Sequence, residues 1–293
     1  MKKKIEPYLF LAPHLLLFVL FILLPLCMTI YTSFTQWDML SMPRFNGFDN
    51  YYKLLFDSES VFYADFRIAM WNTFRFVLIS VPLLVIFPLG IATLLNYKPI
   101  GHGLLLSIFY IPGFFSVATV GLIWKWMLDP QLGTINKIFG LSFQWTTVQP
   151  FVWIAIIIMT LWWTIGANLI IFLAGIAGIP QELYESAEID GAREGTKFWK
   201  ITLPLLKPQM LYIVITTTIA SFNLYGQPLV FSNGGPNKSS STFAMFIQGY
   251  AFGKGTSVAG IASAMGILMG LMVMCVALVQ LYTMRKSEKE EGK

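Results

Sequence analysis

Six long stretches of this chain contain no aspartate, glutamate, lysine or arginine, and each is predominantly apolar. They cover residues 9–34, 76–97, 104–124, 151–180, 208–237 and 256–284. A membrane-spanning helix needs roughly 20 apolar residues, and each stretch meets this length. The chain is 56% hydrophobic and only 12% charged, whereas a soluble domain carries about 25% charged residues. The sequence therefore predicts a protein whose main solvent is lipid.

The expected fold class is an all-α integral membrane protein. Backbone polar groups in lipid must be satisfied within a helix or a closed barrel, and continuous rather than alternating apolar runs disfavour a barrel. The first run exceeds the roughly 7–15 residues of a signal-peptide core and no small-residue cleavage site follows it. We therefore prefer an uncleaved first helix over a cleaved signal. A single domain over residues 1–293 is expected, with six transmembrane helices at about residues 9–34, 72–97, 104–127, 151–177, 208–231 and 257–284.

The distribution of lysine and arginine predicts the orientation. Basic residues near helix ends gather on the cytoplasmic side of a membrane. The six-helix arrangement places Lys2–Lys4, the loop 178–207 and the basic residues 285–293 on one side. Both termini and this loop are therefore expected in the cytoplasm of a bacterium, with the helices in its cytoplasmic membrane. A basic inner face accounts for the net charge of +5, so no nucleic-acid partner is implied.

The densest group of charges lies within the loop 178–207. Proline is favoured at the first helical position and acidic residues near the positive end of the helix dipole. Pro180, followed by Glu182 and Glu185, therefore predicts a short helix from Pro180 to about Asp190.

One face of this helix is mildly apolar. Leu183, Ala187 and Gly191 recur at a spacing that places them on the same side, and Gly191 lets the chain leave the helix. Such a face allows another protein to approach closely. From these residues alone, an amphipathic helix lying at the membrane interface is an equally good interpretation.

The spacing within this loop matches a longer pattern. Glu185, Ala187, Gly191, Ile201, Leu203 and Pro204 lie at fixed offsets that resemble the docking loop of bacterial ATP-binding-cassette import permeases. Residues 190–192 and 201–204 also match, and Ser186 departs from the pattern, where a second alanine is usual. Segments 32–34, 45–51, 124–136, 234–236, 250–252 and 260–264 are similar to the carbohydrate-uptake branch of that family. The resemblance thus covers nearly the whole chain.

The resemblance implies a type I importer permease fold and a set of partners. The chain is similar to the half of a permease heterodimer typified by the maltose-system F-type subunit. A second homologous permease, two ATPase subunits and an extracellular or lipid-anchored sugar-binding protein are the implied partners, with membrane lipid around them. The implied ATPase-docking residues are Glu182, Glu185, Ser186, Ala187, Asp190, Gly191, Ala192 and Arg193.

Two polar stripes mark a candidate substrate pathway. Hydroxyl and amide side chains recur every four residues within the fourth and fifth apolar runs, beside aromatic rings. Such a set suits a sugar, which offers both hydroxyl groups and C–H patches. The alternative is interhelical packing, in which serine and threonine are common. The pathway candidates, several supported by the family resemblance, are Thr160, Trp162, Trp163, Thr164, Asn168, Thr217, Ser221, Asn223 and Tyr225.

The leading hypothesis is a permease subunit of an ATP-driven importer for a di- or oligosaccharide. The chain has no Gly-rich phosphate loop, so a partner ATPase is expected to bind ATP and Mg²⁺, and no cofactor is expected here. No catalytic cluster or metal site is expected, and both cysteines lie inside apolar runs, where thiols pack. Import of glycerol-3-phosphate or another polar solute is the alternative within transport. A membrane scaffold is the alternative outside it.

Overall fold

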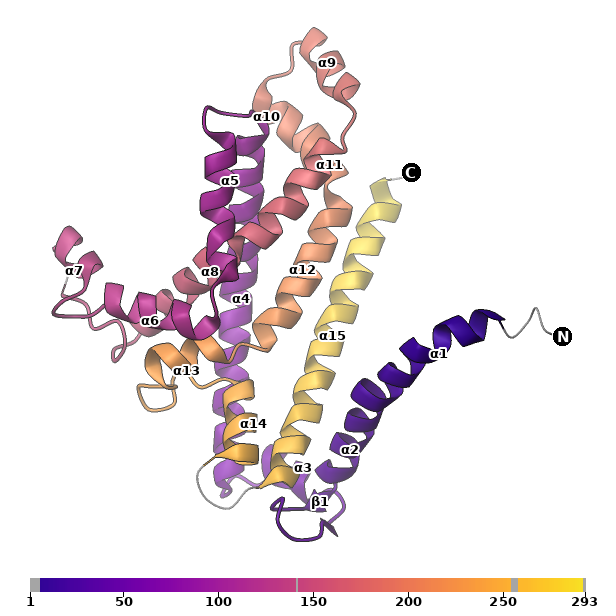
Figure 1. Ribbon diagram of the computed structural model, residues 1–293, viewed down its shortest axis with the longest axis vertical. Coiled ribbons are helices and arrows are strands. Elements are labelled where there is room, and N and C mark those ends of the chain that lie inside the picture. Colours follow the sequence, from indigo (N-terminus) through magenta and orange to yellow (C-terminus); the bar gives the residue numbers. More distant parts are fainter. Residues whose placement is uncertain (1–5, 141, 254–257, 292–293) are drawn as a thin grey trace. The chain divides into compact units, whose positions relative to one another are not determined.

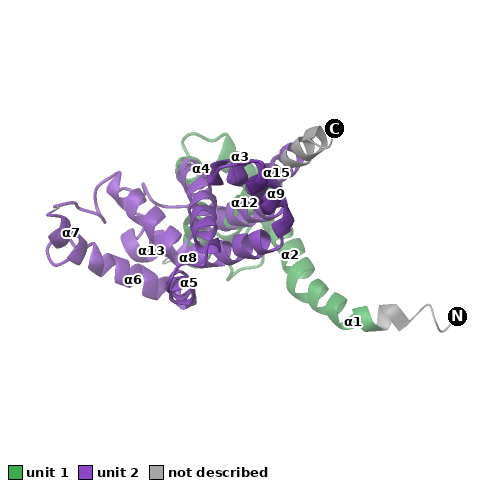
Figure 2. Cartoon of the chain, turned by 90° about the horizontal axis from the view of Figure 1, so that it is seen from above, with its two compact units in different colours: residues 1–69, 243–272 green, residues 70–242, 273–293 purple. Residues whose placement is uncertain are grey.

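The computed structural model describes residues 6–140, 142–253 and 258–291, and it is mainly helical (Figure 1). Within these residues, four helices are long and apolar enough to cross a membrane, or up to six spans if each of two bent helix pairs counts as one. The chain divides into two compact units, residues 1–69 with 243–272 and residues 70–242 with 273–293 (Figure 2).

The first unit is built around the end of the N-terminal apolar helix. Asn50 is buried, and its Nδ2 donates to the carbonyl oxygens of Ser33 at 2.9 Å and Thr35 at 2.8 Å. This amide ties α3 to the end of α2. The unit comprises α1 (Glu6–Phe18), the π-helical turn η2 (Val19–Leu23), α2 (Leu24–Ser33), the antiparallel strands β1 (Thr35–Gln36) and β2 (Arg44–Phe45), α3 (Asp49–Leu55), α14 (Phe243–Phe252), and the first parts of α4 (Val61–Asn96) and α15 (Ala259–Glu291).

The loop between β1 and β2 is closed by a carboxylate. Asp38 Oδ1 accepts hydrogen bonds from the backbone N–H of Ser41 at 2.8 Å, the hydroxyl of Ser41 at 2.7 Å and the backbone N–H of Leu40 at 3.0 Å. These bonds favour the charged form, the Ser41 N–H most, and lower the pKa of Asp38 to about 2. The loop is therefore held by a full negative charge at neutral pH.

Helix α4 begins at Val61, well before the expected start at residue 72. The expected helix was placed around the charge-free run at residues 76–97. Asp65 is nevertheless buried on α4 and accepts a hydrogen bond from the Tyr250 hydroxyl at 2.7 Å. A side chain of the same chain therefore satisfies this carboxylate, and the helix extends towards the N-terminus beyond the charge-free segment.

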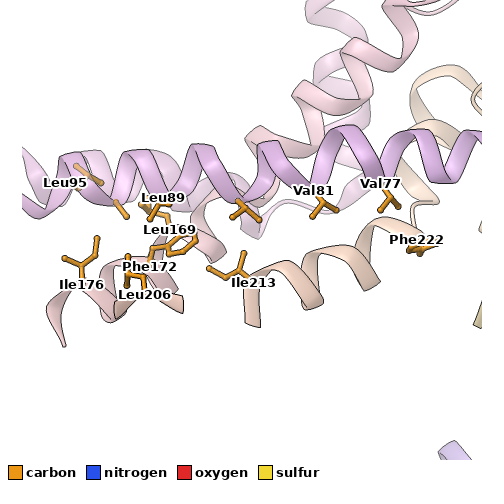
Figure 3. Close-up of a cluster of buried hydrophobic side chains, with 12 residues drawn as sticks. Val77, Val81, Leu89, Leu95, Leu169, Phe172, Ile176, Leu206, Ile213 and Phe222 are labelled. Carbon is orange, nitrogen blue, oxygen red and sulfur yellow. The ribbon is translucent and has the colours of Figure 1, made fainter. Parts of the chain in front are cut away.

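The second unit has a core between three helices. Side chains of α4 at three- and four-residue spacing face side chains of α8 and the α11–α12 segment (Figure 3). We call this set the α4–α8–α12 core: Val77, Val81, Val85, Leu89, Ala92, Leu95, Leu169, Phe172, Ile176, Leu206, Ile213 and Phe222. The unit contains the rest of α4 and α15 with α5 (His102–Tyr110), the 3₁₀ turn η3 (Ile111–Phe114), α6 (Val117–Met127), α7 (Thr134–Phe139), α8 (Phe151–Ala177), α9 (Gln181–Ile189), α10 (Glu194–Lys197), the π-helical turn η4 (Phe198–Thr202), α11 (Leu203–Leu205), α12 (Lys207–Phe222) and α13 (Gly226–Ser232).

The expected straight helix at residues 104–127 is broken. The segment His102–Phe114 meets α6 at 108°. The break lies at Phe115 and Ser116, which are both extended, and the Ser116 hydroxyl caps the new helix by accepting from the backbone N–H of Thr119 at 3.2 Å.

The expected helix at residues 208–231 is also broken. Helix α12 ends at Phe222 and α13 begins at Gly226. Between them, Tyr225 has φ −137° and ψ −61°, outside the helical region. The expected helices at 9–34 and 257–284 correspond to the α1–α2 segment and α15, and the helix at 151–177 coincides with α8.

Candidate functional site: a polar cavity and a charged loop

A polar cavity of about 450 Å³ lies within the second unit. This volume falls in the range of about 300–1,000 Å³ that small-molecule sites occupy. The side chains that surround it come from α4, α6, α8, α12, α13 and the break between the last two helices. They are Phe76, Leu84, Val117, Thr160, Trp163, Thr164, Asn168, Thr216, Thr217, Ala220, Ser221, Asn223, Leu224, Tyr225, Gly226 and Gln227.

The break between α12 and α13 forms one wall of the polar cavity. Asn223 ends α12, and its Nδ2 donates back to the carbonyl oxygen of Ile219 at 2.8 Å. The carbonyl oxygen of Leu224 accepts a hydrogen bond from the Thr242 hydroxyl. Irregular backbone at membrane depth is tolerated where it is buried in protein or lines a cavity. Broken helices of this kind build substrate sites in many transporters.

Helix α8 contributes a polar stripe to the opposite wall. The Thr160 hydroxyl donates to the carbonyl oxygen of Ile156 at 2.7 Å, and the Thr164 hydroxyl donates to that of Thr160 at 2.8 Å. Asn168 reaches across to α4, where its Nδ2 donates to the carbonyl oxygen of Leu84 at 2.9 Å. The stripe is therefore fixed in orientation by bonds to backbone carbonyls.

The structure brings eight of the nine pathway candidates together around the polar cavity. The exception is Trp162, which packs edge-on against Trp124 with ring centroids 6.0 Å apart, beside a second apolar cluster. Trp163 lines the cavity and its Nε1 donates to the carbonyl oxygen of Phe115 at 3.0 Å. Successive residues on a helix point in different directions, so only one of the two neighbouring tryptophans faces the cavity. The sequence pattern did not indicate which one.

Sequence reasoning missed two polar residues of the cavity. Thr216 lies one turn before Ala220 on the cavity-facing side of α12, and Gln227 is the second residue of α13. The stripe through Thr217 and Ser221 was followed at a spacing of four alone, which omitted Thr216. Gln227 required knowledge of the helix break.

Glycines allow α6 to lie close against α13. A Cβ atom on Gly226 would come within 2.6 Å of Val117, and a Cβ on Gly121 within 2.6 Å of Val230. Contacts this short are not available to a larger residue. The two glycines therefore set the separation between α6 and α13, the helix that follows the break in the cavity wall.

The charged loop, residues 180–206, begins with α9 (Figure 1). Helix α9 starts after Pro180, which is extended, so the proline precedes the helix and does not occupy its first position as predicted. At its end, Gly191 has φ +75°. Its N–H donates to the Glu188 carbonyl at 3.0 Å, and the Ala192 N–H donates to the Ala187 carbonyl at 2.9 Å. These two bonds form a Schellman motif, which favours glycine at this position.

A buried lysine holds the charged loop together. The Lys197 side chain is only 6% exposed and its Nζ contacts Glu188 Oε1 at 2.6 Å and Glu194 Oε1 at 2.8 Å. The Tyr97 hydroxyl donates to Glu194 Oε2 at 2.6 Å, and this bond raises the pKa of Tyr97. The ion pairs join α9 to α10, and the tyrosine joins both to the end of α4. The sequence pattern predicts that Lys197 faces the lipid headgroups, and this prediction is wrong, because the side chain is buried and paired with two carboxylates.

The implied docking residues differ in exposure. The exposed members are Glu182, Glu185, Ser186, Asp190, Gly191 and Arg193, and the half-buried members are Ala187 and Ala192. Leu183 is 44% exposed and Ile189 is 88% exposed. Charged and apolar groups are thus presented together on α9, which suits contact with another protein. Ile189 was not among the predicted docking residues.

Among the described residues, no group of three or more His, Cys, Asp and Glu side chains is placed to hold a metal ion. The fold instead defines a class: a helical, multi-pass membrane protein with broken helices around a polar cavity, a design typical of transport proteins.

Comparison with known proteins identifies the family. Residues 69–288 match the model of the binding-protein-dependent transport system inner membrane component, and the chain belongs to this family. It is a membrane subunit of a transport system, not an enzyme.

Relatives match along nearly their whole length. The sulfoquinovosyl glycerol transport system permease protein SmoG of Agrobacterium fabrum is 33% identical, with 96% of this chain and 90% of that protein covered. The arabinooligosaccharides transport system permease protein AraP of Bacillus subtilis is 31% identical, with 99% and 91% covered. The multiple sugar-binding transport system permease protein MsmF of Streptococcus mutans is 30% identical, with 95% of each covered.

Solved structures show the same fold. A chain of a bacterial ABC transporter involved in the import of the acidic polysaccharide alginate matches with a TM-score of 0.77 and 23% identity, over 97% of this chain and 96% of that one. A chain from the alginate transporter in complex with a pentasaccharide-bound periplasmic protein matches with a TM-score of 0.83 and 22% identity, over 98% and 97%. The chain has the fold of an ABC importer permease.

Proposed function

We propose that this chain is one permease subunit of an ATP-driven importer that carries a di- or oligosaccharide across a bacterial cytoplasmic membrane. The observation that carries the proposal is the polar cavity, in which hydroxyl and amide groups lie beside Trp163 and Tyr225. Sugars bind through hydroxyl groups and through C–H patches that rest on aromatic rings. The names of AraP and MsmF support a sugar as the cargo.

The proposed assembly contains a second homologous permease, two ATPase subunits and a sugar-binding protein outside the membrane. The family description names dependence on a binding protein. The ATPases bind ATP and Mg²⁺ in this proposal, and this chain needs no cofactor of its own. In this proposal the second permease completes the pathway, and the polar cavity is this chain's part of it.

The charged loop is the proposed ATPase contact, on the cytoplasmic side with both termini. Glu182, Glu185, Ser186, Asp190 and Arg193 are exposed there. Ala187 and Ala192 are half-buried, and the Ala192 N–H donates to the Ala187 carbonyl in the Schellman motif. This motif keeps the exposed groups of α9 in a fixed relation to α10.

The mechanism we propose transmits motion from the loop to the cavity through packed helices. The α4–α8–α12 core includes Leu206, the last residue of the charged loop, and Phe222, next to the helix break. A movement of α9 imposed by ATPase closure would therefore shift α12 and the broken wall together. Alternating exposure of the cavity to the two sides of the membrane follows from that shift.

Reconstitution of the complete importer tests the proposal. The ATPase activity of the complex in liposomes is measured with its binding protein while neutral sugars from mono- to tetrasaccharide are supplied in turn. We expect stimulation by one size class, together with uptake of the labelled sugar. Stimulation by none of them, in a complex that assembles and hydrolyses ATP, contradicts the sugar assignment.

A further inference from the structure

A proline removes a hydrogen-bond donor from α4 beside the polar cavity. In an α-helix, each carbonyl accepts from the N–H four residues later, so the Leu84 carbonyl would accept from residue 88. That residue is Pro88, which lies inside α4 and has no N–H. Leu84 and Pro88 are both buried, and α4 is long and apolar enough to span a membrane. In that setting lipid offers nothing in place of the missing bond.

A side chain of α8 supplies the missing donor. Asn168 Nδ2 donates to the Leu84 carbonyl at 2.9 Å, and it also donates to the Thr217 hydroxyl oxygen on α12 at the longer distance of 3.4 Å. A carboxamide nitrogen carries two protons, so one serves α4 and the other serves α12. All three residues line the polar cavity. Asn168 therefore joins three helices in the cavity wall, and its nitrogen is engaged within the protein.

The apolar packing beside this hydrogen bond joins the same two helices. Leu89 of α4 and Leu169 of α8 directly follow Pro88 and Asn168 in the sequence, and both belong to the α4–α8–α12 core (Figure 3). Phe76, on the part of α4 before the proline, lines the cavity. Proline inside a helix kinks or weakens it. The Asn168 amide thus holds the cavity-lining part of α4 at the point where the helix lacks one of its own hydrogen bonds.

We infer that Asn168 is a positioning residue for transport, which holds α4 against α8 by replacing the donor that Pro88 removes. It shapes the polar cavity through α4 instead of donating to the cargo. Asn168 and Pro88 therefore act as a pair, and the need for the asparagine exists only while residue 88 is a proline. The inference rests on the proposed function for its transport readout, and its structural part stands on the hydrogen bond alone.

Helix α4 contains a matched control for this pair. Pro82 also lies inside α4, and it is exposed. It removes the donor of the Leu78 carbonyl, not that of Leu84. The Leu78 side chain is 71% exposed, whereas the Leu84 side chain is buried. A substitution at Pro82 therefore makes the same chemical change in the same helix without reaching the Leu84 carbonyl.

A double-mutant cycle in the complete permease–ATPase complex tests the inference. Asn168→Leu removes the donor and keeps a side chain of similar size. Pro88→Ala returns an N–H to the Leu84 carbonyl, and Pro82→Ala is the control. The thermal midpoint of each single variant and each pairing is measured without sugar.

Transport is measured in liposomes with the binding protein, at a temperature well below the lowest midpoint. The probes are labelled maltotriose, arabinotriose and raffinose, and uptake per complex is compared for whichever of them the native importer carries.

We expect Asn168→Leu alone to lower the midpoint by a few degrees and uptake by about tenfold, because a buried carbonyl loses its donor. In the Pro88→Ala background, the same change should lower uptake by less than about twofold and leave the midpoint unchanged, because the backbone then supplies the bond. In the Pro82→Ala background, Asn168→Leu should retain its full effect on both properties.

Three results overturn the inference. Equal losses from Asn168→Leu in the native and Pro88→Ala backgrounds would mean that the asparagine does not act through Leu84. Equal rescue by Pro82→Ala would mean that any restored bond in α4 suffices. A lower midpoint with native uptake would mean that Asn168 supports the fold without positioning the cavity.

Failure of the proposed function has a different signature. If the native complex assembles but carries none of the sugars, the sugar assignment fails, whereas the midpoints of the cycle still confirm or overturn the pairing of Asn168 with Pro88.

Discussion

At the scale of single residues, the backbone conformation of Gly191 explains why a glycine stands at this position of the loop pattern. Its φ of +75° belongs to the left-handed region, which glycine enters freely and other L-residues enter at a cost of roughly 1–2 kcal/mol. No atom lies within 4 Å of where its Cβ would be. The requirement at Gly191 is therefore one of backbone conformation, not of space.

This distinction gives a prediction for two substitutions of Gly191. Gly191→Ala should strain the Schellman motif and reduce sugar-stimulated ATP hydrolysis, whereas Gly191→Asn should retain most of it, because asparagine tolerates the left-handed region better. ATPase activity of the reconstituted complex and co-purification of the ATPase measure the effect. Equal activity of the alanine and asparagine variants would show that the motif is not needed.

Lys197 is the second residue whose role depends on geometry. Its side chain is almost fully buried between two exposed glutamates, Glu188 and Glu194. Without the lysine, two like charges face each other across α9 and α10. Lys197→Met should therefore loosen α9 and lower the amount of sugar moved per ATP hydrolysed.

The conservative variant Lys197→Arg is the matched control, since it keeps the positive charge. We expect it to restore part of the transport-to-hydrolysis ratio, as measured by labelled uptake and phosphate release in the same liposomes. If the Lys197→Met complex forms in normal yield and keeps the native transport-to-hydrolysis ratio, then Lys197 does not contribute to coupling.

At the scale of secondary-structure elements, apolar length predicted where helices lie but not where they break. The helix at 151–177 was predicted with the bounds of α8, because nothing interrupts its apolar run. The breaks after Phe222 and after Phe114 lie inside equally apolar runs. Hydropathy does not indicate these breaks, because a break depends on hydrogen-bond partners for the backbone, such as the Thr242 hydroxyl that donates to the Leu224 carbonyl.

The candidate site, too, could be predicted only in part from the sequence. Helical periodicity placed Thr160, Thr164 and Asn168 on one face of α8, and they do line one cavity. Periodicity did not indicate that Trp162 points elsewhere, or that Gln227 joins the site after a break. These positions depend on contacts between helices, which a single sequence does not contain.

Close packing of α6 against α13 gives a prediction at this scale. Gly226→Ala places a Cβ within 2.6 Å of Val117, and overpacking of this kind typically costs about 1–3 kcal/mol. We expect a lower thermal midpoint of the detergent-solubilised complex. Gly90→Ala is the control, since no atom lies within 4 Å of its Cβ position, and it should leave the midpoint unchanged.

A second substitution sharpens this test. The double variant Gly226→Ala with Val117→Ala removes the branched side chain that the new methyl group meets, so it should recover most of the lost stability. A double variant no more stable than Gly226→Ala alone would place the defect outside the α6–α13 contact.

At the scale of the whole molecule, the family and the fold were predicted from the sequence because the loop signature is joined by apolar runs and matching segments along most of the chain. What the sequence did not indicate is how its two candidate functional regions are joined. In the second unit, α8 carries the polar stripe of the cavity at Thr164 and contributes Phe172 and Ile176 to the α4–α8–α12 core. The same core holds Leu206, the last residue of the charged loop.

Phe172 therefore lies between the charged loop and the polar cavity. It is fully buried, and removal of a buried phenylalanine side chain typically costs about 3–5 kcal/mol in protein cores. Phe172→Ala should lower the thermal midpoint and also reduce the sugar moved per ATP hydrolysed, because the cavity left in the core absorbs motion. Phe172→Leu fills most of that space and should preserve both properties. If the alanine variant loses stability but transports at the native ratio to ATP hydrolysis, then the core supports the fold without transmitting movement from the loop to the cavity.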